Sequence, residues 1–494
     1  MNRTKMIQQL ESQTEWDVCI IGGGATGLGT ALDAASRGLK TILFEQYDFA
    51  KGTSSKSTKL VHGGVRYLQQ GNIRLVMEAL KERGLLLKNA PHLVHNQQFI
   101  VPNYKWWEKP FYGIGLKIYD WMAGKLGLGP SALLSKEETL ALAPTLDAEG
   151  LTGGVVYHDG QFDDARLAIS IAQTAVQYGA VVLNYFPVTG LLKMQQKVCG
   201  VWAKDSQTGK EREVKSKVVI NATGVFTDTV MKMDDPKHES IISPSQGIHL
   251  VVDKEFLPGD TAIMVPRTDD GRVLFAVPWH NKIVLGTTDT PVNSISAEPV
   301  PFEEEIDFIL THIGRYLTKD PQRSDVKSMF AGLRPLVKGK TKKTAALARD
   351  HLITIADSGM ITITGGKWTT YRKMAEDVVD IAMEKAGLEK KDCITEDMKL
   401  ADYSATVIPA DINSLSNDEL KAIVQQSVTE EMCMTTEDFL SRRTRQLLLD
   451  ARFAITIAPV VATMLAEEMN KDENWIKEQI NNFNAIAKNY LPLK

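Results

Sequence analysis

The sequence predicts an α/β fold in which a Rossmann-like dinucleotide-binding domain is combined with an antiparallel-sheet substrate domain and a helical C-terminal cap domain. Three observations lead to this prediction. A β-α-β pattern with closely spaced glycines lies near the N-terminus, runs of alternating β-branched residues fill the middle of the chain, and the region after residue 390 is polar, helical in periodicity and poor in glycine. At 494 residues the chain is too long for one hydrophobic core, so roughly two or three domains are expected.

The N-terminal pattern has every part of a dinucleotide-binding unit. A short buried strand ends at Gly22-x-Gly24-x-x-Gly27, a helical pattern follows directly, and a second strand ends at Glu45. The glycines allow the backbone to approach a pyrophosphate at the N-terminus of the helix. Glu45 lies about 20 residues beyond them, where a carboxylate binds a ribose hydroxyl. This fingerprint alone does not distinguish one dinucleotide from another.

The middle of the chain adds three alternating runs, 241–252, 272–278 and 282–288, which predict an antiparallel sheet. Helical patterns cover residues 73–89 and 369–386. The expected domain limits are residues 1–90, 150–240 and 330–388 for the dinucleotide-binding domain, residues 91–149 and 241–330 for the substrate-binding domain with its membrane-associating segment, and residues 389–494 for the helical C-terminal domain.

Composition narrows the functional classes. The net charge of −4 gives no reason to expect a nucleic-acid partner. The four cysteines lie far apart, without metal-ligand spacing, so we expect no metal site and reduced thiols in a cytosolic setting. Residues 1–15 are polar, which excludes a secretory signal, and no window resembles a membrane-spanning helix.

One segment, residues 104–126, has the composition of a membrane-surface helix. It holds three of the eight tryptophans, mixed with tyrosine and lysine. Ile114, Ile118, Trp121 and Met122 are expected on one helical face, and such a helix lies in the headgroup layer without crossing the membrane. The alternative is a helix that packs this face against its own protein.

Several long motifs remain. The most specific are the block from Thr53 to Tyr67, with Ser-Ser-x-Ser-Thr-Lys-Leu-x-His-Gly-Gly-x-Arg-Tyr, and the block from Gly365 to Arg372, with Gly-Gly-Lys-x-Thr-Thr-Tyr-Arg. With the shorter motifs, they make the chain closely resemble the FAD-dependent respiratory glycerol-3-phosphate dehydrogenases, a family of peripheral membrane enzymes. The shorter motifs are Asp163–Arg166, Asn221–Gly224, Gly247–His249, Gly286–Asp289, Gly332–Pro335, Arg349–Asp350 and Asp438–Thr444.

The resemblance implies a two-dinucleotide-binding fold that binds FAD. It implies oxidation of sn-glycerol 3-phosphate to dihydroxyacetone phosphate by hydride transfer to FAD, with electrons passed to a membrane quinone. It further implies peripheral attachment to the cytoplasmic face of the inner membrane, and it admits a homodimer. A glycerophosphate oxidase of the same fold, which uses O₂ and produces hydrogen peroxide, remains the alternative.

The resemblance also assigns residues to roles. Arg66, Tyr67, Arg334 and Arg349 become candidates for the substrate phosphate, because guanidinium groups bind phosphate oxygens in pairs and keep their charge. His249 is the candidate base for the substrate hydroxyl, since histidine exchanges protons near neutral pH.

His62 is the rival base. Lys367, at the start of a helix, would stabilise negative charge on the reduced flavin. Arg334 and Lys367 join His249 as the catalytic candidates. Gln246 stands where some relatives have lysine, so one possible cation beside the substrate is missing. The expected cofactor-binding residues are Gly22, Gly24, Gly27, Glu45, Thr53, Ser54, Ser55, Leu60, His62, Gly63, Val188, Ala222, Gly224, Gly332, Gly366, Lys367 and Thr369.

Overall fold

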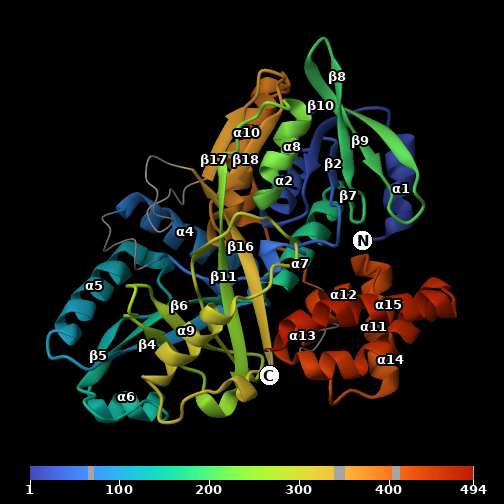
Figure 1. Cartoon of the computed structure of the whole chain (residues 1–494). Helices are drawn as coiled ribbons and strands as arrows, with labels where there is room; N and C mark the ends of the chain where they lie inside the picture. Colours follow the sequence, from blue (N-terminus) through green and yellow to red (C-terminus); the bar gives the residue numbers. More distant parts are fainter. Residues whose placement is uncertain (65–71, 339–350, 403–411, 493–494) are drawn as a thin grey trace.

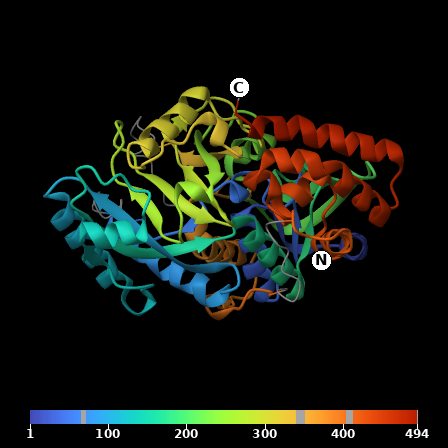
Figure 2. The ribbon, with the colours of Figure 1, turned by 90° about the horizontal axis from the view of Figure 1, so that it is seen from below.

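A computed structural model of the chain describes residues 1–64, 72–338, 351–402 and 412–492. Two β-sheets form its framework, and a group of helices from the C-terminal part of the chain lies beside both (Figure 1). Viewed from below, helix α5 and the C-terminal helices lie at opposite ends of the molecule (Figure 2).

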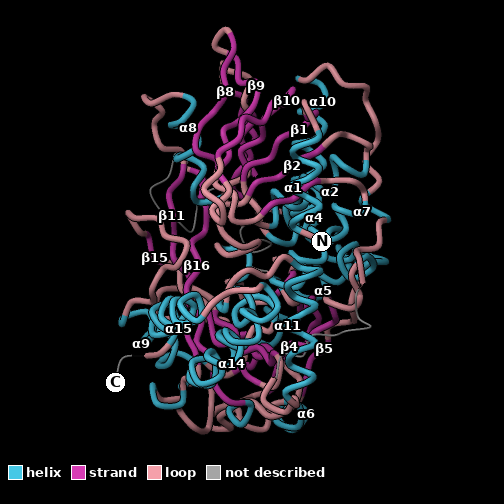
Figure 3. Tube along the Cα trace, turned by 90° about the vertical axis from the view of Figure 1, so that its right-hand side faces the viewer, coloured by secondary structure: helices cyan, strands magenta, loops and turns pink. Residues whose placement is uncertain are grey.

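The first sheet is mainly parallel and contains the predicted β-α-β unit. Strand β1 (Trp16–Ile21) lies between β2 (Thr41–Phe44) and β10 (Glu211–Asn221), and the strand order is β17-β18-β10-β1-β2-β7. Helices α2, α7 and α10 pack on one another beside it (Figure 3). The strand bounds are β7 Val181–Leu183, β8 Val188–Met194, β9 Lys197–Lys204, β17 His351–Ile355 and β18 Ile361–Gly365; the helices are α1 Arg3–Ser12, α2 Ala25–Ser36, α7 Asp164–Gln177, α8 Thr227–Asp234 and α10 Tyr371–Lys385.

The second sheet is mainly antiparallel and has the order β15-β11-β14-β13-β12-β4-β6-β3, with β16 paired to β11 and β5 paired to β6. Helix α9 covers one face, where alternate residues of β11 such as Ile248 and Leu250 form a core. The bounds are β3 Leu60–Val61, β4 Val94–Asn103, β5 Ala132–Leu134, β6 Gly153–Phe162, β11 Ile242–Asp253, β12 Ala262–Val265, β13 Leu274–Trp279, β14 Lys282–Gly286, β15 Thr290–Pro291 and β16 Ser328–Val337; the helices are α4 Ile73–Asn89, α5 Glu108–Ala123, α6 Lys136–Leu142 and α9 Glu303–Gly314.

The C-terminal helices have their own core and are joined to the rest of the chain by buried ion pairs. They are α11 Asn417–Glu431, α12 Thr436–Asp438, α13 Gln446–Leu449, α14 Ala451–Met469 and α15 Glu473–Ala487. Asp48, close to strand β2, accepts hydrogen bonds from Arg442 at 2.6 Å and from Arg443 at 2.7 and 2.9 Å. Arg166 of α7 binds Glu431 through both guanidinium arms.

The elements that the sequence predicts are confirmed, with small changes at their ends. Helix α2, which follows the glycine motif, begins at Ala25, because Gly24 is its N-cap, and the helix predicted from residue 369 begins at Tyr371 after a 3₁₀ turn. Strands β6 and β16 pair within the antiparallel sheet, although the sequence analysis grouped both segments with the dinucleotide-binding domain.

Candidate cofactor and substrate site

The glycines of the N-terminal motif are required by close backbone contacts. A Cβ atom on Gly22, whose φ is 111°, would lie 2.7 Å from the carbonyl oxygen of Ala222. A Cβ atom on Gly27 would lie 1.9 Å from the carbonyl oxygen of Gly22. The helix therefore begins directly against the ends of β1 and β10, and its first N–H groups lie beside a cavity of about 240 Å³. This geometry suits the pyrophosphate of a dinucleotide.

Glu45 lies at the rim of this cavity, at the end of β2. Its carboxylate accepts hydrogen bonds from the backbone N–H of Gly23 at 2.6 Å and from that of Tyr47 at 2.9 Å. Burial raises the pKa of the Glu45 carboxyl. The carboxylate is thus held beside the glycine loop, at the position from which it can accept ribose hydroxyl groups.

Most of the predicted cofactor residues line this same cavity, although they come from distant parts of the chain. They are Gly22, Gly24, Glu45, Thr53, Ser54, Val188, Ala222, Gly224, Gly366 and Lys367. Lys367 precedes the short 3₁₀ turn before α10, and the indole of Trp368 donates a hydrogen bond to the carbonyl oxygen of Ser54 at 2.9 Å. The donor set and the shape therefore fit a dinucleotide that extends from the glycine loop toward the antiparallel sheet.

Other predicted cofactor residues lie in or near a second, larger cavity. Leu60 and His62 line the larger cavity, and the backbone N–H of His62 donates to Thr369 Oγ1 at 3.3 Å. Gly63 N–H donates to the hydroxyl of Tyr119 at 2.8 Å. A Cβ atom on Gly332 would lie 3.0 Å from the carbonyl oxygen of Lys56, and the carbonyl oxygen of Ser55 accepts from Lys59.

The larger cavity has a volume of about 950 Å³ and contains the predicted phosphate-binding residue Arg334. The Arg334 guanidinium donates to Thr287 Oγ1 at 3.1 Å and to the carbonyl oxygen of Gln246 at 3.3 Å, and it lies 3.4 Å from an oxygen of Asp289. Gly247 gives it room, because a Cβ atom there would lie 2.3 Å from Arg334 Nη2. A fixed guanidinium in a cavity of this size suits a small anionic substrate.

His249 lies on the same face of β11 as Gly247 and adjoins this cavity. Its Nε2 is 2.9 Å from Oγ1 of Thr58, which lines the cavity, and its ring stacks on Phe330 with 4.9 Å between the centroids. Burial, together with the nearby cations Lys59 and Arg334, holds the pKa of His249 well below the ordinary value for histidine. The imidazole is therefore neutral and able to accept a proton.

Gln246 is directed away from Arg334. Its side-chain amide donates to Glu305 at 2.8 Å and to the carbonyl oxygen of Val300 at 3.0 Å. Glu305 also accepts from Thr288 at 2.7 Å and from Thr290 at 2.6 Å. Gln246 thus belongs to a buried hydrogen-bond network with Glu305 and the two threonines.

Three predicted phosphate-binding residues, Arg66, Tyr67 and Arg349, lie outside the described residues. Sequence reasoning missed other residues of the larger cavity, including Thr58 and Arg267. Thr58 belongs to the first long motif, and this position could have indicated that it lies in the site. No motif in the sequence indicated Arg267.

Helix α5 forms part of the wall of the larger cavity and also exposes an apolar surface. Phe111, Ile114 and Ile118 line the cavity. Trp121 is 83% exposed and Ile114 is 65% exposed. The prediction for Met122 was wrong, because its side chain is buried against α4. Among the described residues, no helix combines the length and the apolar character needed to cross a bilayer.

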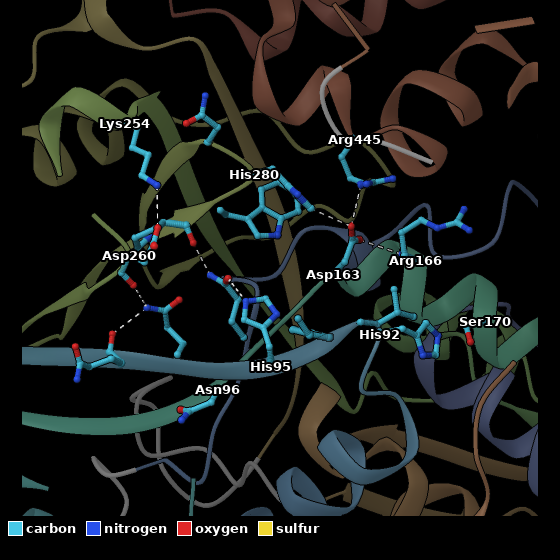
Figure 4. Close-up of a pocket in the computed structure, with 18 of the residues that line it drawn as sticks. His92, His95, Asn96, Asp163, Arg166, Ser170, Lys254, Asp260, His280 and Arg445 are labelled. Atoms are coloured by element: carbon cyan, nitrogen blue, oxygen red, sulfur yellow. Dashed lines mark hydrogen bonds and ion pairs between the residues drawn. The ribbon is translucent and has the colours of Figure 1, made fainter. Parts of the chain in front are cut away.

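A third cavity, of about 610 Å³, lies between β4, α7 and the C-terminal region (Figure 4). Of the predicted site residues that the structure describes, none lines it. Its central charges are already paired, since Asp163 Oδ2 lies 2.8 Å from Arg445 Nε and 3.3 Å from His280 Nε2 (Figure 4). The larger cavity beside Arg334 is therefore the candidate site.

Comparison with known proteins agrees with this geometry. Residues 17–372 match the family described as FAD dependent oxidoreductase, and residues 396–476 match the C-terminal domain of alpha-glycerophosphate oxidase. The mitochondrial glycerol-3-phosphate dehydrogenase of Bos taurus is 40% identical over 97% of this chain and 74% of its own length, and that of Schizosaccharomyces pombe is 38% identical over 96% and 87%.

A solved structure extends the match to the whole fold. The X-ray structure of the glycerol-3-phosphate dehydrogenase from Bacillus halodurans, complexed with FAD, has a TM-score of 0.81 at 31% identity and covers 99% of this chain and 98% of that one. The predicted fold class and FAD as the cofactor are thereby confirmed. The chain belongs to the family of FAD-dependent glycerol-3-phosphate dehydrogenases.

Proposed function

We propose that this protein oxidises sn-glycerol 3-phosphate to dihydroxyacetone phosphate in the 950 Å³ cavity and passes the electrons to a quinone at a membrane surface. The residues from the glycine loop to Lys367 would hold FAD, which would supply the hydride acceptor. The observation that carries the proposal is the composition of one cavity. It is lined by the guanidinium of Arg334, by Thr58, which is hydrogen-bonded to His249, and by apolar side chains of the surface helix α5.

Arg334 binds the substrate phosphate. Its neighbours Thr287 and Gln246 hold the guanidinium in place before substrate arrives, so less side-chain entropy is lost on binding. Arg66, Tyr67 and Arg349 are the further candidates for the same phosphate. A phosphate dianion needs more than one cation, which is why a set of arginines is expected there.

His249 accepts the proton of the C2 hydroxyl. Thr58 shares a hydrogen bond with His249 Nε2 and lines the cavity, so its hydroxyl connects the base with the substrate. Lys367 lies just before the turn that leads into α10, and there its positive charge would stabilise negative charge on a bound flavin. His62 lines the cavity too and is the alternative base.

The quinone reaches the cavity along α5. Phe111, Ile114 and Ile118 line it, and the same helix exposes Trp121 and Ile114 to the outside. Lys117 is an exposed lysine on the same helix. Helices that expose both tryptophan and lysine are typical of the headgroup layer. A hydrophobic acceptor dissolved in the bilayer can therefore enter beside this helix. Attachment at the cytoplasmic face of the inner membrane and a homodimer belong to the same proposal.

The test is an anaerobic flavin spectrum of the purified protein before and after addition of glycerol 3-phosphate, followed by a quinone analogue or by O₂. We expect bleaching of the flavin band, fast reoxidation by the quinone analogue and slow reoxidation by O₂. Fast reoxidation by O₂ alone would identify the oxidase instead. No bleaching at any pH would refute the substrate. The rate of bleaching is also compared in His249→Gln and His62→Gln. It should fall in His249→Gln and stay at the wild-type value in His62→Gln; the reverse result would identify His62 as the base.

A further inference from the structure

Lys59 is a fully buried cation in the first long motif, and the function proposed above gives it no role. Its ammonium group donates to both oxygens of Asp164, at 2.7 and 2.8 Å, and to the carbonyl oxygen of Ser55 at 2.8 Å. These bonds use all three of its N–H groups. Its backbone has φ 63°, a left-handed conformation that lysine adopts only when its surroundings fix it.

The ammonium group lies against two aromatic rings. It is 4.9 Å from the ring centroid of Trp279 and 5.2 Å from that of Phe330. Phe330 is the ring on which His249 stacks. Lys59 and His249 therefore both contact the same aromatic side chain, in an interior that screens charge much less than water does.

Among the residues that the structure describes, the other groups around His249 do not replace this cation. Thr58 is neutral, and Gly286 offers only backbone, on which the edge of the imidazole packs. Arg334 is the second nearby cation, but its side chain is 25% exposed and has Asp289 beside it. Lys59 is completely buried, and its partner Asp164 is the first residue of α7.

We propose that Lys59 is a positioning residue for His249: fixed by Asp164 and Ser55 behind Phe330, its ammonium group keeps the imidazole uncharged and oriented toward Thr58. An imidazole that carries a proton cannot accept another. The buried cation therefore extends the proton-accepting state of His249 to lower pH. This inference rests on the proposed function, in which His249 is the base.

The expected size of the effect follows from Coulomb's law. The two groups lie at most about 10 Å apart across Phe330, and at an effective dielectric constant of about 20 such a separation corresponds to a pKa change of about one unit. Removal of the cation favours the imidazolium form, so the pKa of His249 rises. The acid limb of the kcat/KM profile should then move to higher pH by about one unit, with up to a tenfold loss of kcat/KM at pH values on that limb.

The experiment compares Lys59→Met with the wild-type holoenzyme in two measurements: the pH profile of kcat/KM, and the titration of ¹³Cε1-labelled histidines followed by NMR. With nine histidines, the His249 signal is assigned from its loss in His249→Gln. Lys56→Met is the matched control. Lys56 is also buried, in the same loop, but its ammonium group pairs with Glu298 at 2.6 Å.

A second variant, Lys59→Met/Asp164→Asn, removes the partner charge as well and keeps the test valid if the single variant folds poorly. It should shift the acid limb and the His249 titration in the same direction. The proposal is overturned if both Lys59 variants bleach with glycerol 3-phosphate but keep the wild-type limb and titration, or if Lys56→Met shifts them equally. Failure of the proposed function would look different, since the wild-type flavin would then not bleach at all.

Discussion

The double variant Trp121→Ser/Ile114→Ser tests whether the apolar face of α5 attaches the protein to a membrane. Trp121 is 83% exposed, and a tryptophan side chain of about 250 Å² then presents about 200 Å² to solvent. At about 25 cal/mol per Å², full immersion of that area contributes about 5 kcal/mol, and Ile114, 65% exposed, adds about 1–2 kcal/mol. A helix that lies in the headgroup layer immerses roughly half of such a face. The double variant should therefore lose about 3 kcal/mol of binding, on the order of a hundredfold in partitioning.

The assay is co-sedimentation with vesicles that contain anionic lipid. The matched control is Met194→Ser/Trp202→Ser, which removes an aliphatic and an indole side chain from the β8–β9 hairpin, far from α5 (Figure 1). The control should sediment like the wild-type protein. Turnover with a water-soluble dye should persist in the control variant, which changes no residue that lines the larger cavity; in the α5 variant it measures whether the loss of Ile114 from the cavity wall also affects catalysis. Equal sedimentation of the α5 variant and the wild-type protein would refute the membrane role of this face.

Two further predictions concern the site and the buried charges. Arg334→Ala should raise KM for glycerol 3-phosphate about 30-fold or more while FAD stays bound, because a fixed cation that binds phosphate contributes about 2–5 kcal/mol to binding. Steady-state kinetics measure KM, and the flavin spectrum shows whether FAD is still bound. An unchanged KM would contradict the role of Arg334. Asp48→Ala should lower the free energy of unfolding by about 3–5 kcal/mol, measured by denaturant titration, because it leaves Arg442 and Arg443 buried without their partner. Burial raises the pKa of Asp48, but Arg443 and Arg442 outweigh it and hold that pKa well below its ordinary value. The stability that the pairs contribute is therefore present above about pH 4 and is lost on acidification. The free energy of unfolding of the variant should depend less on acid pH than that of the wild-type protein, and an equal dependence would argue against the pairing.

The elements around the cofactor could be predicted from the sequence because their causes are local. The glycines, the helix start at Ala25 and the carboxylate of Glu45 follow one another within a single β-α-β unit, and each is set by the geometry of its neighbours. The antiparallel strands follow from alternation in the same way. Arg334 and Gly247 lie in adjacent strands, and the family motifs that contain them indicated both positions.

Side-chain directions that depend on distant partners could not be predicted. Met122 follows Trp121 by one helical step and turns inward, because α4 packs against that side of α5. Gln246 points to Glu305, 59 residues away, and not to the substrate cavity. Lys59 pairs with Asp164 across 105 residues, and no local periodicity encodes such a contact. The sequence supplied the residue types, whereas their partners required the fold.

The attachment of the C-terminal helices to Asp48 has a consequence for how the enzyme matures. Asp48 lies in the loop that begins at Glu45, and its partners Arg442 and Arg443 follow 394 and 395 residues later in the chain. A ribosome that synthesises from the N-terminus exposes the loop long before it delivers the arginines. The loop that holds the ribose carboxylate therefore acquires this support only after Arg442 and Arg443 have been synthesised. Cofactor loading is accordingly expected to be completed after the C-terminal helices have formed, and not on the emerging N-terminal half of the chain.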